Sequence, residues 1–141
     1  MIYLHPLFQV VMFGLGAYAF LMGTVRFRSL HLKQRTAFAR KRHALFGLVA
    51  LAGFYAGMIG GSILCDLLAL DPYMGEGHEA GALVMAVLAG IGLASGLLLY
   101  WKPKARKALP LVHGISNTLA LLMVAYQTFS GVQIIQRVLS R

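Results

Sequence analysis

The chain is poor in charged residues, in acids above all, and in cysteine, and these shortages exclude several classes of protein. Only 12% of its 141 residues are charged, whereas 59% are hydrophobic, a composition that excludes an ordinary soluble domain. The one cysteine, Cys65, cannot form an internal disulfide. The sequence also lacks a Cys-x-x-Cys-His motif, which argues against covalently attached haem.

The chain contains four long apolar runs instead. Such runs can span a bilayer as helices, and we expect these helices at about 3–25, 43–65, 79–101 and 111–136. The short connections predict an all-α polytopic membrane protein, an antiparallel bundle of four transmembrane helices that forms a single domain, 1–141. The first run is too long for a cleavable signal and has no basic lead or small-residue cleavage site, so we expect it to stay in the membrane.

The basic residues are concentrated in two of the three connections. Seven Lys and Arg lie within 26–42 and four within 102–107, which makes 11 of the 13, while the four acids lie in or beside the second connection. Because cytoplasmic loops collect Lys and Arg, both basic connections are predicted to be cytoplasmic and both termini non-cytoplasmic. We expect an integral protein of a bacterial inner membrane whose basic loops contact anionic lipid, with no nucleic-acid partner.

Four of the five histidines lie near the N-terminal ends of the predicted helices, one in each helix: His5, His43, His78 and His113. Since neighbouring helices are antiparallel, His5 and His78 should share the outer membrane level, and His43 and His113 the inner level. Two such pairs predict two stacked b-type haems, with His5 and His78 as ligands of the outer haem iron and His43 and His113 of the inner. Zinc fits less well, because no acid or thiol completes either pair.

A glycine follows each of these histidines at a spacing of eighteen residues: Gly23, Gly61, Gly96 and Gly131. Eighteen residues are five helical turns, so each glycine lies on the face of its own histidine, about 27 Å further along the helix. In an antiparallel bundle that is the level of the other histidine pair. We therefore predict that each glycine clears space for the edge of a haem bound by the other helices.

These motifs resemble the four-helix core of the cytochrome b561 family. His5-Pro6 opens one helix, a basic run leads into His43-Ala44, and His78 and His113 start the other two. The resemblance implies transmembrane electron transfer through two non-covalent haems, with these four histidines as axial ligands. Members commonly have six helices, and the chain shows no counterpart of the residues that bind ascorbate or ferric substrate there.

Iron held by two imidazoles has no open position for substrate, so we expect an electron carrier or transmembrane reductase without a bond-making site of its own. Arg40 and Arg42 are the predicted cofactor contacts of the inner haem propionates, with Lys107 as a further candidate, and Tyr3 or Arg137 could meet the outer ones. The second ring nitrogen of each histidine is expected to bond a helix carbonyl one turn back.

The sequence does not identify the electron partner or the oligomeric state. The electron partner is expected to be a redox protein or a quinone, and a homodimer or a larger complex remains possible. One alternative is a membrane-anchor or quinol-interacting subunit of a larger redox complex. The other is a haem-free proton or ion pathway that uses the histidines as titrating groups.

Overall fold

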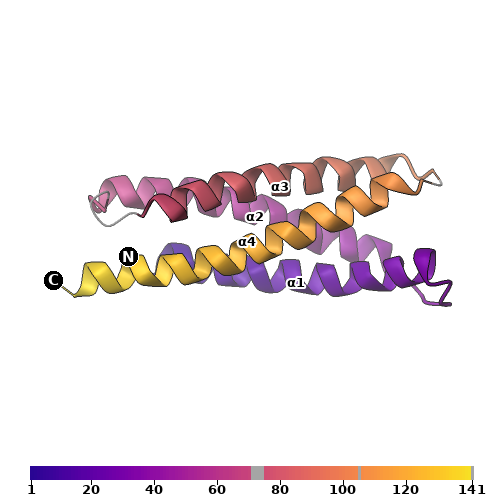
Figure 1. The fold of residues 1–141 in the computed structure, drawn as a ribbon, viewed down its shortest axis with the longest axis horizontal. Helices are drawn as coiled ribbons and strands as arrows, with labels where there is room; N and C mark the ends of the chain where they lie inside the picture. Colours follow the sequence, from indigo (N-terminus) through magenta and orange to yellow (C-terminus); the bar gives the residue numbers. More distant parts are fainter. Residues whose placement is uncertain (71–74, 105, 141) are drawn as a thin grey trace.

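The computed structural model describes residues 1–70, 75–104 and 106–140. In these residues the fold is all-helical, with four helices and no strand: α1 (Leu4–His31), α2 (Arg40–Leu67), α3 (Glu76–Trp101) and α4 (Ala108–Leu139) (Figure 1). Each helix is long and apolar enough to cross a membrane. The predicted fold class, a polytopic all-α membrane protein with four antiparallel helices, is confirmed.

The bundle is built from two helical hairpins. Helix α1 packs closely along α2, and α3 along α4, whereas contacts of α1 with α4 and of α2 with α3 are far fewer. The remaining pairs, α1 with α3 and α2 with α4, face each other diagonally across the bundle. The interface between the two hairpins is therefore the loosest part of the structure.

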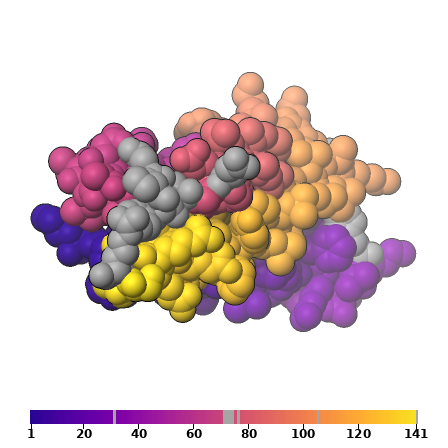
Figure 2. Space-filling view, turned by 60° about the vertical axis from the view of Figure 1, so that its left-hand side comes forward, coloured from indigo at the N-terminus to yellow at the C-terminus, as the bar shows by residue number. Residues whose placement is uncertain are grey.

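The two ends of the bundle differ in charge. Figure 1 shows the α1–α2 and α3–α4 connections together at one end, which we call the basic end because these segments carry most of the Lys and Arg. Both termini lie at the opposite end, which we call the terminal end. Figure 2 brings the terminal end forward and shows the last turns of α4 beside the start of α3. Which end faces the cytoplasm stays a prediction.

The helices extend beyond the predicted spans. Helix α1 continues to His31 rather than ending near residue 25, and α2, α3 and α4 each begin three residues earlier than expected. The apolar run marks only the part that lipid must cover, and nothing in residues 26–31 stops a helix there, since neither proline nor glycine is present. The polar turns continue the helix outside the hydrocarbon region.

A small apolar cluster fills the middle of the bundle. Its buried members are Leu51, Phe54, Met85, Ala89 and Val124. Phe54 is the largest side chain that is fully buried, with 1% of its surface exposed, whereas many other large apolar side chains face outward, as lipid contact requires. The centre of the molecule is thus an apolar layer, with polar groups toward both ends.

Arg40 ties two helices together at the basic end. Its guanidinium donates a hydrogen bond to the main-chain carbonyl of Tyr100, in the last turn of α3, and lies 4.9 Å from the centroid of the Tyr100 ring. A cation at the C-terminus of a helix also interacts favourably with the helix dipole. Arg40 therefore joins the first turn of α2 to the last turn of α3.

We expect Phe54→Ala to destabilise the bundle by about 3–5 kcal/mol, because it leaves a cavity in the central cluster. Phe129→Ala is the matched control, since Phe129 is 64% exposed on α4 and should lose little packing. Denaturation of the detergent-solubilised protein, followed by circular dichroism, measures both. Equal effects of the two substitutions would contradict the central position of Phe54.

Candidate functional site

The histidines of α2 and α4 meet near the basic end. The ring centroids of His43 and His113 are 6.0 Å apart, and the ring planes are inclined by 75°. These rings come from diagonally opposed helices and are half-buried in the bundle. We call His43 and His113, together with Gly23 and Gly96, the basic-end layer.

The histidines of α1 and α3 lie near the terminal end. His5 and His78 are half-buried, come from the other diagonal pair of helices, and are close enough to interact electrostatically. We call these two residues, together with Gly61 and Gly131, the terminal-end layer. The structure thus brings the four histidines together in twos, with one diagonal pair at each end.

Each glycine of the two layers lies against a histidine ring of its hairpin partner. A Cβ built at Gly61 would lie 2.8 Å from Cε1 of His5, and one at Gly96 would lie 3.0 Å from Cε1 of His113. The corresponding distances are 3.3 Å from Gly23 to His43 and 3.6 Å from Gly131 to His78. A side chain at Gly61 would therefore displace the His5 ring, one at Gly96 or Gly23 would make a tight contact, and one at Gly131 would make an ordinary contact. The role of these glycines in clearing a haem edge stays a prediction.

Three of the imidazoles donate a hydrogen bond to a main-chain carbonyl of the neighbouring helix. Nδ1 of His5 lies 2.8 Å from the oxygen of Gly57, Nδ1 of His43 lies 2.9 Å from that of Ala19, and Nδ1 of His113 lies 3.0 Å from that of Gly92. A carbonyl only accepts, so Nδ1 carries the proton and Nε2 keeps a lone pair in the neutral ring. The expected carbonyl partners are present, but the neighbouring helix supplies them.

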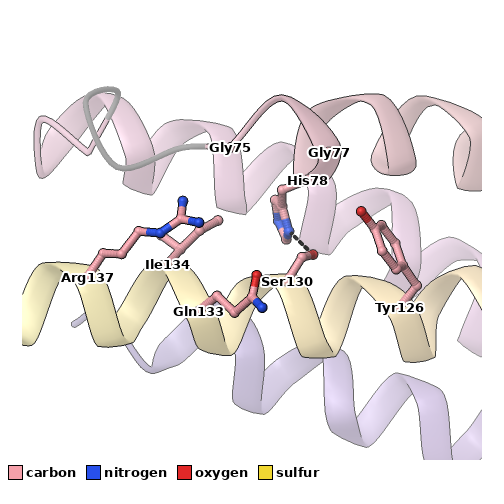
Figure 3. A pocket seen from close by; sticks show the side chains of 8 residues that line it. All are labelled: Gly75, Gly77, His78, Tyr126, Ser130, Gln133, Ile134 and Arg137. Atoms are coloured by element: carbon pink, nitrogen blue, oxygen red, sulfur yellow. Dashed lines mark hydrogen bonds between the residues drawn. The ribbon is translucent and has the colours of Figure 1, made fainter.

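His78 differs from the other three histidines. Its Nδ1 lies 2.8 Å from the hydroxyl oxygen of Ser130. Figure 3 draws this hydrogen bond as a dashed line. The Ser130 hydroxyl is within 3.2 Å of both the main-chain and the side-chain oxygen of Gln127, and the Gln127 amide donates to the carbonyl of His78 at 2.7 Å. A side-chain network holds this ring in place of a direct carbonyl contact.

Two polar side chains occupy equivalent positions beside the carbonyls that bind histidine. Gln9 lies one turn after His5 and packs on Gly57, while Asn117 lies one turn after His113 and packs on Gly92. Asn117 donates to the carbonyl of His113 at 2.7 Å, and the buried side-chain oxygen of Gln9 has no partner within the described residues. Both side chains use the space left by glycine.

The cations predicted to meet haem propionates lie in different surroundings. Arg40 is bound to Tyr100, as described above, whereas Arg42 and Lys107 are exposed at the basic end. At the terminal end Tyr3 is 51% exposed, and Arg137 lines a cavity of about 130 Å³ next to His78 and Ser130 (Figure 3). Arg137 thus lines the same cavity as His78.

The donor set of each layer consists of two imidazoles. Among the described residues there is no group of three or more His, Cys, Asp and Glu side chains that could hold a metal ion. Two nitrogen donors do not satisfy a tetrahedral ion such as zinc, but they suffice for an iron whose other four positions are filled by a porphyrin. The layers are thus suited to axial ligation.

Sequence reasoning missed the groups that hold the rings. The three carbonyls belong to Ala19, Gly57 and Gly92, and each lies fourteen residues after the histidine of its own helix and one turn before the layer glycine. A helical side chain covers the turn that precedes it, so glycine uncovers the carbonyl of that turn. The glycine spacing could have revealed these three acceptors, but not Ser130.

Gly61→Ala and Gly131→Ala should have opposite effects. Alanine favours a helix by about 1 kcal/mol over glycine. At Gly61, however, the added methyl would push the His5 ring, at a cost of about 1–3 kcal/mol, whereas at Gly131 it would make an ordinary contact. We expect Gly61→Ala to lower and Gly131→Ala to raise the stability of the detergent-solubilised protein. The same sign for both would contradict the difference in packing.

Comparisons of this chain with protein families, with curated proteins and with solved structures found no match. The resemblance to the cytochrome b561 family therefore rests on the histidine motifs alone and stays a prediction.

Proposed function

We propose that the chain is a di-haem b-type membrane cytochrome that passes electrons between two haems, one in each histidine layer. His43 and His113 would be the axial ligands at the basic end, and His5 and His78 those at the terminal end. The observation that carries the proposal is the pairing of half-buried imidazoles from diagonal helices at both ends of the bundle.

The geometry of the basic-end layer fits a shared iron. Two metal–imidazole bonds of about 2.0 Å each, together with the half-widths of two rings, place the ring centroids about 6 Å apart, and the separation here is 6.0 Å. The hydrogen bonds of His43 and His113 at Nδ1 leave Nε2 as the ligand atom. Such bonds fix the tautomer and orientation of a ligand and raise its basicity.

The rest of each layer is consistent with a flat ligand. The histidines occupy one diagonal of the bundle, and the glycines of the layer occupy the other diagonal. Each layer glycine lies against a histidine ring of its own hairpin, so no side chain from these positions extends between the two hairpins, whose mutual contacts are few. The loose interface is where a porphyrin would add apolar contacts that the protein lacks.

The apolar centre favours electron transfer over proton transfer. Between the two layers lie the side chains of Leu51, Phe54, Met85, Ala89 and Val124. A proton or ion pathway needs a continuous line of polar groups or water, which this cluster interrupts within the described part of the chain. Electron transfer between haems needs no continuous line of polar groups. The apolar centre therefore favours electron transfer over the haem-free proton or ion pathway.

A haem held by two imidazoles takes up and releases one electron without binding a substrate. The central cluster would exclude water, the acceptors at Nδ1 would orient the ligands, and Arg137 would lie beside the terminal-end haem in the cavity next to His78. We propose that the chain is a cytochrome b561-like electron carrier in a redox chain. Its electron partner would be a redox protein or a quinone.

The direct test is a pyridine haemochrome assay on protein purified from cells grown with ample haem. We expect about two haems per chain and an absorption spectrum typical of low-spin iron with two imidazole ligands. Purified, folded protein without a Soret band would overturn the proposal. Haem that remains bound after acid–acetone extraction would contradict the non-covalent b-type attachment.

Single substitutions test the pairing. His43→Ala should remove the haem of the basic-end layer and leave the other, halving the haem content, and His113→Ala should do the same. His31→Ala is the control, since the sequence gives that histidine no ligand role, and it should retain both haems. If His43→Ala lost both haems while its helix content by circular dichroism stayed that of the unaltered protein, independent layers would be ruled out.

A further inference from the structure

The four histidines differ in the hydrogen-bond partner of Nδ1, although each layer contains two histidines and two glycines. In three of them Nδ1 donates to a helix carbonyl, and His113 has the hydroxyl of Ser95 as a second neighbour at 3.2 Å. In His78 the partner of Nδ1 within the described residues is the hydroxyl of Ser130, at 2.8 Å. The looser packing at Gly131 accompanies this difference, since a Cβ there would lie 3.6 Å from the His78 ring, against 2.8 Å for Gly61 and the His5 ring. The serine side chain thus stands between His78 and the helix backbone.

The direction of the Ser130 hydrogen bonds follows from its neighbours. Both oxygens of Gln127 that lie within 3.2 Å of the hydroxyl are acceptors, so the hydroxyl donates to Gln127. Its oxygen is then left to accept the proton of His78 Nδ1. The chain of bonds runs from His78 through Ser130 to Gln127, and Ser130 takes the place that a carbonyl holds at the other three histidines.

Ser130 also lies at the wall of a polar cavity. The cavity of about 130 Å³ is lined by His78, Ser130, Tyr126, Gln133 and Arg137, among others. In Figure 3 the side chains of α4 extend toward the start of α3, and His78 extends from α3 to meet Ser130. His78 therefore lies beside a polar cavity.

We propose that Ser130 is a positioning residue that sets the reduction potential of the terminal-end haem through the Nδ1 hydrogen bond of His78. This inference rests on the proposed function, because it needs haem in both layers. An acceptor at Nδ1 makes the imidazole more basic and stabilises ferric iron. Loss of that acceptor should therefore raise the potential of this haem and leave the other unchanged.

The test is a spectroelectrochemical titration of the Ser130→Ala protein with both haems bound. One of the two midpoint potentials should rise, and the equilibrium constant for one-electron reduction should change by up to about tenfold, which is ~59 mV. The controls are the buried serines Ser116 and Ser95. Ser116→Ala removes a hydroxyl that bonds only the main chain. Ser95→Ala removes a hydroxyl that lies 3.2 Å from Nδ1 of His113, but this ring keeps its carbonyl partner at 3.0 Å.

If Ser130→Ala fails to hold the terminal-end haem, Ser130→Thr and Ser130→Cys carry the test. Threonine keeps the hydroxyl and should keep the potential of the unaltered protein, while cysteine is a weaker acceptor and should raise it. A potential that does not rise in the cysteine variant, or that rises equally at both haems in either the alanine or the cysteine variant, overturns the role of Ser130.

The two failures are distinguishable. Absence of haem from the unaltered protein overturns the proposed function and this inference together. Two haems in the unaltered protein, with both midpoint potentials unmoved by Ser130→Ala, overturns only the inference and leaves the proposed function standing.

Discussion

The structure depends on one requirement, which is that a proton on Nδ1 of a half-buried imidazole must have an acceptor. Leaving such a donor unpaired costs about 1–3 kcal/mol. Helix carbonyls are already bonded within the helix and are normally covered by the side chain one turn later. A glycine one turn after Ala19, Gly57 and Gly92 removes that cover, so the ring of the neighbouring helix can reach the oxygen. The histidine, the glycine and the acceptor carbonyl thus form one structural unit.

This combination of histidine, glycine and carbonyl joins the two helices of each hairpin. Each hairpin places the histidine of one helix on the glycine of the other, and the same helices exchange these roles at the opposite end. Within a hairpin the contacts are close, while the two hairpins touch each other lightly. The ring nitrogens that remain available, Nε2, belong to rings that pair across the bundle between the hairpins. Each hairpin therefore contributes one histidine and one glycine to each layer.

Much of this arrangement was predictable from the sequence, for physical reasons. Apolar runs long enough for a bilayer predict the four helices, and antiparallel neighbours with histidines at their starts lead to two levels. The helix ends were less predictable, as α1 shows by continuing to His31, because hydropathy reports lipid contact rather than helix termination. Ser130 was not predictable, since a serine beside a histidine depends on how α4 is rotated and spaced against α3. Arg40 likewise binds Tyr100, a partner sixty residues away that local patterns do not indicate.

The light contact between the hairpins has a consequence for biogenesis. We expect each hairpin to be able to close on its own, because the bonds that orient its two rings lie inside it. On this expectation, final assembly is a lateral meeting of two hairpins within the lipid plane, and the proposed haems would enter between them.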